Sequence, residues 1–227
     1  MNSTVDIPAM QQADAEAFDV IIIGAGLSGI GTAVRLQRDC PDRDFILLER
    51  REAIGGTWDL FRYPGIRSDS DMHTLGYDFK PWEAEKSIAD GPSILSYVNE
   101  TADEHRLRER IRFSQKLLAA DWCSERSQWQ LTVETPEGVR RYRCGFLMMC
   151  AGYYSYDQGY EPDFEGKGSF KGEWIHPQFW PDNLNYAEKK VVVIGSGATA
   201  MTLVPNMSRQ AAHVTMLQRS PTYVVSR

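Results

Sequence analysis

The stretch Phe18-Asp-Val-Ile-Ile-Ile-Gly24-Ala-Gly26-Leu-Ser-Gly29 decides the fold of the first part of the chain. Its β-branched run predicts a buried parallel strand, and the glycines that follow fit the pattern G-x-G-x-x-G at the start of a helix. Gly24 permits a tight turn, Gly26 lets the backbone approach a diphosphate, and Gly29 lets helix and strand pack closely. The stretch predicts a dinucleotide-binding α/β unit, the alternative being a glycine turn in an unrelated α/β unit.

The residues after this turn supply the other parts that a dinucleotide fold needs. A helical pattern ends near Cys40-Pro41, and a second strand, 44–48, runs into Glu49, which lies 20 residues after Gly29. An acid at that place accepts ribose hydroxyls, while the helix N-terminus stabilises the phosphates. The candidate binding residues of this first site are therefore Gly24, Gly26, Ser28, Gly29 and Glu49.

A second glycine pair, Gly55-Gly56, follows the ribose acid, as in the flavin-binding members of this fold. We therefore expect FAD at the first site. The segment 55–69, GGTWDLFRYPGIRSD, fits G-G-x-W-x-x-x-x-Y-P-G-x-x-x-D in full and resembles the Baeyer–Villiger monooxygenases, which use FAD and NADPH. The alternative for its aromatic residues is a packed loop. Charged side chains beside them favour a redox pocket, with candidate residues Gly56, Thr57, Trp58, Asp59, Leu60, Arg67, Ser68 and Asp69.

A second nucleotide motif begins with the apolar strand 190–194, followed by Gly195-Ser-Gly197-Ala-Thr-Ala200, a helix and a strand, 213–217. Ala200 fits the G/A variant of the third glycine. The second strand ends in Gln218-Arg219-Ser220, which has no acid for a 2′-hydroxyl but can bind a 2′-phosphate. This predicts NADPH, unless Arg219 is a solvated surface residue. The candidates are Gly195, Ser196, Gly197, Ala198, Thr199, Ala200, Met201, Arg219 and Ser220.

Between the two motifs the sequence predicts a helix over 93–110, an antiparallel meander of strands 116–120, 128–133 and 139–143, and a closing strand, 146–150. Residues 153–189 read as a linker, and within it 170–181 fit F-x-G-x-x-x-H-x-x-x-W-P. We expect a disordered tail at 1–17, an FAD domain at 18–152 and the start of an NADPH domain at 190–227. The fold class is α/β, with two Rossmann-like units, the second incomplete.

Composition excludes several classes of protein. A net charge of −6 argues against a nucleic-acid partner, and no apolar run is long enough for a transmembrane segment. The four cysteines lack C-x-x-C spacing, so we expect reduced thiols, no metal site and a cytoplasmic location. Disulfide reductases need a cysteine pair after the ribose acid, and residues 50–70 contain none.

The resemblance runs from about Val20 to the end, and segments 56–71 and 213–222 are most similar to the ethionamide-activating branch and to long-chain ketone and alkane oxidisers. It implies insertion of one oxygen atom of O₂ next to a ketone carbonyl through a C4a-peroxyflavin, giving an ester or lactone. The resemblance further implies a small-molecule substrate, either a ketone or a thio-compound that is oxidised at sulfur, together with O₂.

The resemblance also implies roles for single residues. The backbone near Leu117 meets adenine, and Asp69 holds an active-site arginine that is expected beyond Arg227. Arg67, Ser68 and Asp69 lie where flavin and nicotinamide meet. His176 couples the domains, with direct catalysis as the alternative. An N- or S-oxidising flavin monooxygenase and a non-catalytic nucleotide-binding fragment remain alternatives, and the oligomeric state is open.

Overall fold

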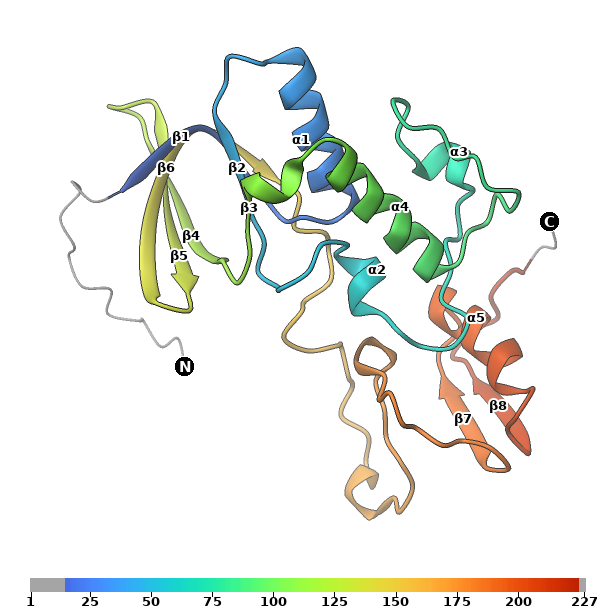
Figure 1. The fold of residues 1–227 in the computed structure, drawn as a ribbon. Coiled ribbons are helices and arrows are strands. Elements are labelled where there is room, and N and C mark those ends of the chain that lie inside the picture. Colours follow the sequence, from blue (N-terminus) through green and yellow to red (C-terminus); the bar gives the residue numbers. More distant parts are fainter. Residues whose placement is uncertain (1–14, 225–227) are drawn as a thin grey trace. The chain divides into compact units, whose positions relative to one another are not determined.

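The computed structural model describes residues 15–224, and the chain divides into two compact units, each taken separately below (Figure 1). The first unit comprises Met1–Ile54 and Ala102–Ala151, and the second comprises Gly55–Thr101 and Gly152–Arg227. Most of the predicted tail lies outside the described residues. Its last two residues, 16 and 17, belong to the first strand, which begins two residues earlier than the sequence pattern indicates.

The first unit is built on one six-stranded sheet of order β3-β2-β1-β6-β5-β4. Strands β3, β2, β1 and β6 run parallel, whereas β5 is antiparallel to both β6 and β4. Helix α1 (Leu27–Asp39) connects β1 to β2, and the 3₁₀ helix η2 (Leu107–Arg110) precedes β3. The strands are β1 (Glu16–Ile23), β2 (Phe45–Leu48), β3 (Ile111–Arg112), β4 (Lys116–Cys123), β5 (Gln128–Thr135) and β6 (Gly138–Met149).

The antiparallel meander is part of the main sheet. The sequence predicts separate strands at 139–143 and 146–150, and this is wrong, because β6 is one continuous strand of 12 residues. Cys144 pairs with Trp129 of β5 on one side and with Phe18 of β1 on the other. Only Cys144 and Gly145 lie between the two predicted strands, and the pairing of Cys144 on both sides joins them into one strand.

The sheet of the first unit has a buried core on each face. On one face Ile21, Ile46, Leu131, Val133 and Tyr142 pack together, each at most 6% exposed. On the other, β1 and β2 present fully buried Ile22 and Leu47, and α1 contributes buried Gly29, Ile30, Ala33 and Val34. The alternation of two buried faces is what a β-branched parallel strand requires. This packing fixes the ends of β1 and β2, where the predicted site lies.

The predicted helix 93–110 is split in two. Helix α4 spans Gly91–Glu104, and the backbone N–H of Ser93 donates to the side chain of Asp90 at 2.9 Å. The chain then leaves the helix at Arg106, whose φ of +52° is left-handed, and η2 forms a separate turn. A left-handed residue is a common helix end, and it terminates the apolar stripe that suggested a single longer helix.

The second unit contains short helices and one parallel strand pair. A short helical turn, α3, lies in the segment after Leu60, and β7 and β8 pair in parallel around α5 as a β-α-β unit. The elements are α2 (Thr57–Leu60), α3 (Met72–Leu75), most of α4, η3 (Lys167–Ser169), η4 (Pro177–Phe179), β7 (Lys190–Ile194), α5 (Ala198–Met207) and β8 (His213–Leu217). None of the helices in residues 15–224 is long and apolar enough to cross a membrane.

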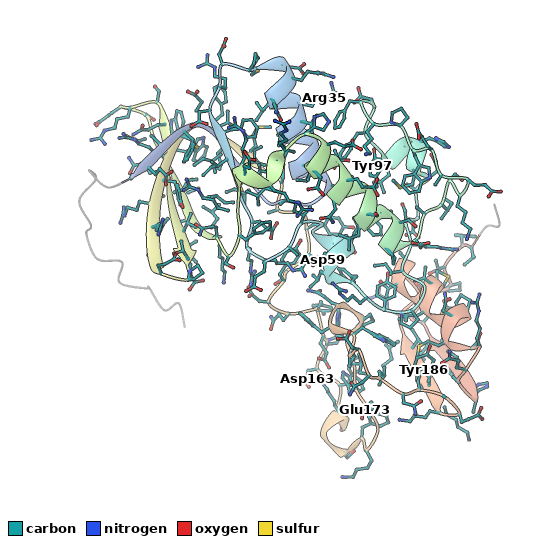
Figure 2. All side chains as sticks on the ribbon, in the orientation of Figure 1. Arg35, Asp59, Tyr97, Asp163, Glu173 and Tyr186 are labelled. Atoms are coloured by element: carbon teal, nitrogen blue, oxygen red, sulfur yellow. The ribbon has the colours of Figure 1, made fainter. Side chains whose placement is uncertain are left out.

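The core of the second unit joins residues that lie far apart in sequence. Phe61 and Tyr63 pack with Leu203 and Met207 of α5, with Trp180 and Tyr186 at the edge (Tyr186 is labelled in Figure 2). Judged by its contacts, the segment 55–101 therefore groups with α5 and the predicted linker. The sequence pattern instead places this segment within the predicted FAD domain, 18–152. Most residues of the predicted linker are exposed, whereas Gln178 within it is only 3% exposed.

Candidate cofactor sites

The first glycine turn, between β1 and α1, leaves no room for a side chain at Gly24 or Gly29. Gly24 has a φ of +103°, and a Cβ on it would lie 2.6 Å from the carbonyl oxygen of Cys150. A Cβ on Gly29 would lie 1.9 Å from the carbonyl oxygen of Gly24. Helix α1 is N-capped by Gly26 without a side-chain hydrogen bond. A helix N-terminus of this kind is suited to an anionic group such as a diphosphate.

Glu49, at the end of β2, lies against this turn. Its carboxylate is 3% exposed, and its Oε2 accepts a hydrogen bond from the backbone N–H of Ala25 at 2.7 Å. Its Oε1 accepts from the backbone N–H of Arg51 at 2.8 Å. A carboxylate has about four acceptor positions, so both oxygens keep capacity for ribose hydroxyls. The structure thus brings together the turn and the acid that the sequence pairs.

Leu117, expected near adenine, lies on β4 beside an irregularity in its pairing with β5. The strand approaches Glu49 through Gln115, whose backbone N–H donates to the carbonyl oxygen of Glu49 at 2.8 Å. The side chain of Gln115 is 9% exposed and accepts from the Tyr142 hydroxyl at 3.1 Å. Sequence reasoning missed Gln115, because a single glutamine before an apolar strand carries no distinctive pattern.

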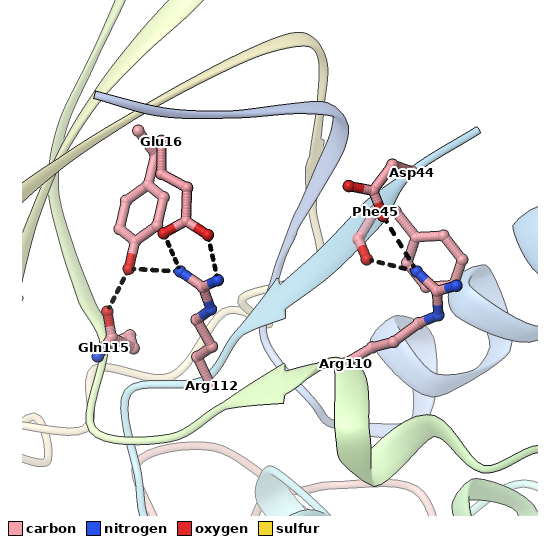
Figure 3. Close-up of polar contacts among 7 residues, drawn as sticks. Glu16, Asp44, Phe45, Arg110, Arg112 and Gln115 are labelled. Carbon is pink, nitrogen blue, oxygen red and sulfur yellow. Dashed lines mark hydrogen bonds and ion pairs between the residues drawn. The ribbon is translucent and has the colours of Figure 1, made fainter. Parts of the chain in front are cut away.

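A network of charged and polar side chains connects Glu16 and Arg112 to Gln115 (Figure 3). The guanidinium of Arg112 makes two hydrogen bonds to the carboxylate of Glu16, one of them 2.6 Å long, and donates to the Tyr142 hydroxyl at 3.2 Å. The bond to Arg112 lowers the pKa of Glu16, and the same pair raises the pKa of Arg112. The network joins β1, β3 and β6, and through Tyr142 it holds Gln115 beside Glu49.

In the second unit, residues 55–60 form a turn and a short helix. Gly55 has a φ of +123°, and a Cβ on it would lie 2.3 Å from the Leu95 side chain of α4. Gly56 N-caps α2 with a φ of +56° and a ψ of −122°, a combination that favours glycine. Candidates Thr57, Trp58, Asp59 and Leu60 make up α2, and Asp59, labelled in Figure 2, pairs with Arg62 at 3.0 Å. The close packing against Leu95 therefore explains the glycine at position 55 without a bound ligand.

Arg67, Ser68 and Asp69 lie on a segment that pairs with the chain around Asp90. Arg67 forms an isolated β-bridge with Asp90, and the backbone N–H of Ser68 donates to the carbonyl oxygen of Ala89 at 2.9 Å. Ser68 is 4% exposed, whereas Arg67 and Asp69 are both exposed.

Tyr154, which sequence reasoning missed, lies near Asp69. Tyr154 packs on Phe61 with ring centroids 4.9 Å apart and on Tyr153 at 4.5 Å. A hydrogen bond to the Tyr153 hydroxyl, together with burial and the charges of Tyr63 and Asp69, raises the pKa of Tyr154 to about 12. The phenol therefore stays neutral at physiological pH. Residues 153–160 contain four tyrosines, and they lie in the segment that the sequence predicts to be a linker.

His176 holds the predicted linker in place. Its Nδ1 accepts from the backbone N–H of Gln178 at 3.2 Å, and a Cβ on Gly159 would lie 2.2 Å from its ring. The buried side chain of Gln178 in turn donates to the carbonyl oxygen of Ser155 at 2.6 Å. Within residues 15–224 no hydrogen bond or ion pair joins His176 to Asp69. The contacts of His176 are those of a residue that positions the loop 155–159.

The second glycine turn, between β7 and α5, is open. The N–H of Gly195 donates to the carbonyl oxygen of Leu217 at 2.8 Å, and its φ is +124°. A Cβ on Gly195 or Gly197 would meet no atom within 4 Å, so side chains here would fill free space beside the N-terminus of α5. The other candidates, Ser196, Ala198, Thr199, Ala200 and Met201, lie in this turn or in the first turn of the helix.

Arg219 and Ser220 follow β8 after one residue, Gln218, and both are exposed. Among the described residues the guanidinium of Arg219 makes no hydrogen bond or ion pair. Two residues later the Thr222 hydroxyl donates to the Ser196 hydroxyl at 2.7 Å, which brings this segment back to the glycine turn. Sequence reasoning missed Thr222. Across the part of the chain that the structure covers, no three His, Cys, Asp or Glu side chains are grouped to hold a metal ion.

Comparison with known proteins matches the model of one family, described as flavin-binding monooxygenase-like, over residues 17–227. The FAD-containing monooxygenase EthA of Mycolicibacterium smegmatis is 58% identical over 93% of this chain and 43% of its own length. The probable FAD-binding monooxygenase AlmA of Acinetobacter baylyi is 55% identical over 92% of this chain and 42% of its own. The chain thus spans less than half the length of these relatives.

Solved structures agree with the fold. Cyclohexanone monooxygenase from Rhodococcus sp. Phi1 bound to NADP⁺ superposes with a TM-score of 0.79 at 29% identity, over 93% of this chain and 40% of that enzyme. A steroid monooxygenase bound to NADP gives a TM-score of 0.80 at 31% identity, over 92% and 40%. The α/β class with Rossmann-like units is confirmed. The chain belongs to the flavin-binding monooxygenase-like family.

Proposed function

We propose that this chain is the cofactor-binding portion of an FAD- and NADPH-dependent monooxygenase that inserts one oxygen atom of O₂ next to a ketone carbonyl. One contrast carries the proposal: the two glycine turns end in opposite chemistry. A buried Glu49 follows the first, and the second is followed by Arg219, which makes no hydrogen bond or ion pair with residues 15–224. An acid suits a ribose hydroxyl and an arginine suits a 2′-phosphate, so the turns fit different dinucleotides. Bound FAD would relay electrons from NADPH to O₂.

The residues of the first unit fit the adenosine diphosphate half of FAD. The uncapped N-terminus of α1 at Gly26 can donate to the diphosphate, and Glu49, fixed by two backbone N–H groups, can accept from the ribose. Ser28 and Gly29 lie in the same turn, and the Leu117 backbone is assigned to adenine. In the second unit, residues 56–60, Ser68 and Asp69 are assigned to FAD. These assignments rest on the sequence motifs.

The second turn fits NADPH. Space beside Gly195 and Gly197 leaves room for a diphosphate, and the helix N-terminus offers backbone donors. Arg219 is exposed and has no competing acid among the described residues, so its guanidinium can pair with a 2′-phosphate. By function we therefore assign FAD binding to 18–152, a joining segment to 153–189 and NADPH binding to 190–227.

For the oxygen insertion, the exposed pair of Arg67 and Asp69 is the group we place nearest the reacting centre. Asp69 would hold a further arginine by ion pairing, as the family resemblance implies, and His176 would position the loop rather than move a proton. A ketone substrate is supported by the relation to cyclohexanone monooxygenase, and a thio-compound is kept as a second substrate class. A cytoplasmic location stays a prediction.

Two other functions remain open. Oxidation at nitrogen or sulfur is a candidate because the family description covers flavin-binding monooxygenases in general. A non-catalytic nucleotide-binding fragment is a candidate because the two glycine turns account for nucleotide binding without any oxygen chemistry.

The test uses purified protein supplied with FAD. NADPH should bleach the flavin absorbance without oxygen, and with oxygen and a ketone an ester should be detected by mass spectrometry. Ester supports Baeyer–Villiger chemistry, and a sulfoxide or N-oxide without ester supports the first alternative. If NADPH cannot reduce the flavin, the result supports the second alternative, a non-catalytic nucleotide-binding fragment.

Arg219→Ala tests the cofactor assignment separately. A charge-assisted hydrogen bond contributes about 1.5–3 kcal/mol, so NADPH affinity should fall by about ten- to a hundredfold while NADH affinity stays within about twofold. Arg209→Ala is the matched control, since this exposed arginine follows α5. Equal loss of both cofactors in Arg219→Ala would remove the 2′-phosphate role.

A further inference from the structure

The loop Gln218–Pro221 is closed at both ends on the second glycine turn. Before the loop, the carbonyl oxygen of Leu217 accepts from the backbone N–H of Gly195 at 2.8 Å. After it, the Thr222 hydroxyl donates to the Ser196 hydroxyl at 2.7 Å. Two neighbouring residues of the turn therefore hold the two flanks of one short loop.

This closure limits where Arg219 can lie. The side chain itself is exposed and has no hydrogen bond or ion pair within residues 15–224, so nothing else holds it near the turn. A long, unpaired arginine loses side-chain entropy when it binds an anion, and a loop that is already closed reduces the backbone part of that loss. The ring of Pro221 restricts the loop further by fixing one φ angle.

We infer that Thr222 is a positioning residue for NADPH: its bond to Ser196 latches the loop that carries Arg219 against the glycine turn, and so sets the preference for a 2′-phosphate. This inference rests on the proposed NADPH site. The latch acts through Arg219 and not by contact with the cofactor, so its removal should affect NADPH and spare NADH.

The experiment measures dissociation constants for NADPH and NADH by calorimetry on the whole protein. Thr222→Val keeps the side-chain shape and removes the hydroxyl. An exposed hydroxyl–hydroxyl bond has a modest net effect, so NADPH affinity should fall by about three- to tenfold, with NADH unchanged within about twofold. Thr222→Ser, which keeps the hydroxyl, should restore NADPH affinity. Thr215→Val, an exposed threonine of β8, should change neither.

A double-mutant cycle separates a latch from a general structural effect. In the Arg219→Ala background, Thr222→Val should have almost no further effect on NADPH affinity, since the side chain that the latch positions is absent. Full additivity of the two changes, or equal loss of NADPH and NADH in Thr222→Val, would overturn the latch. If the unaltered protein itself shows no preference for NADPH over NADH, the proposed NADPH site fails first, and the latch fails with it.

Discussion

Gly65→Ala should destabilise the second unit by about 3 kcal/mol, from three sources. Gly65 has a φ of +81°, and a side chain in the left-handed region costs about 1–2 kcal/mol. Its Cβ would lie 1.9 Å from Nδ2 of Asn206, which must move and lose its 2.7 Å bond to the Thr202 carbonyl, a loss of about 1 kcal/mol. The Cβ would also lie 3.0 Å from that carbonyl oxygen, which adds overpacking.

Gly166 supplies a matched control within the same unit. Its φ is +79°, and the nearest atom to an added Cβ is Oγ of Ser169 at 3.8 Å. Gly166→Ala therefore carries the backbone strain without the collision and should cost only about 1–2 kcal/mol. The difference between the two variants measures how tightly the Tyr63-Pro64-Gly65 turn packs on α5.

Urea denaturation followed by tryptophan fluorescence is a suitable assay, because Trp180 packs against the Phe61–Leu203 cluster. Asn206→Ala should relieve part of the collision, so that Gly65→Ala costs at least 1 kcal/mol less in that background. Equal effects of Gly65→Ala and Gly166→Ala, or strict additivity with Asn206→Ala, would refute the packing argument.

Three further outcomes follow from the first unit. Arg112 lowers the pKa of Glu16 in the folded protein. Their ion pair should therefore stabilise the fold fully at pH values above the unfolded pKa of Glu16, about 4.3. This stabilisation should be lost as the pH falls through the lower pKa that Glu16 has in the folded state. Urea midpoints between pH 7 and 3 should show an acid-dependent loss that Glu16→Gln lacks. Burial raises the pKa of Cys144 to about 11, so a thiol reagent should label exposed Cys40 at once and Cys144 only on unfolding; rapid labelling of both in native protein would contradict this. Gly24→Ala would place a Cβ 2.6 Å from a backbone carbonyl oxygen and should abolish retention of FAD on gel filtration, whereas unchanged flavin content would exclude the turn as its site.

The local geometry of both cofactor turns could be predicted from the sequence. Gly24 and Gly195 have φ angles of +103° and +124°, and each turn leads into a helix that glycine N-caps. Such features depend on residues within a few positions of one another, so a motif specifies them. The acid after one second strand and the arginine after the other are likewise local, and they separate the two sites chemically.

Other features were decided by contacts between distant residues. The pattern of residues 139–150 predicts two strands, but pairing with β5 and with β1 makes them one. The segment around Phe61 and Tyr63 reads as part of the FAD domain, yet its apolar side chains are buried against Leu203 and Met207. Burial depends on which surfaces meet, and a periodicity in one segment does not contain that information.

The sequence by itself determined the two glycine turns, the family resemblance and the chemical difference between Glu49 and Arg219. Only the tertiary structure decided how those residues are held: Glu49 by the backbone of Ala25, 24 residues away, and the Arg219 loop by a hydroxyl bond over a separation of 26 residues. The physical reason is that a motif fixes the dihedral angles of its own residues, whereas a hydrogen bond between distant residues exists only after the chain has folded and brought them within 3 Å of each other.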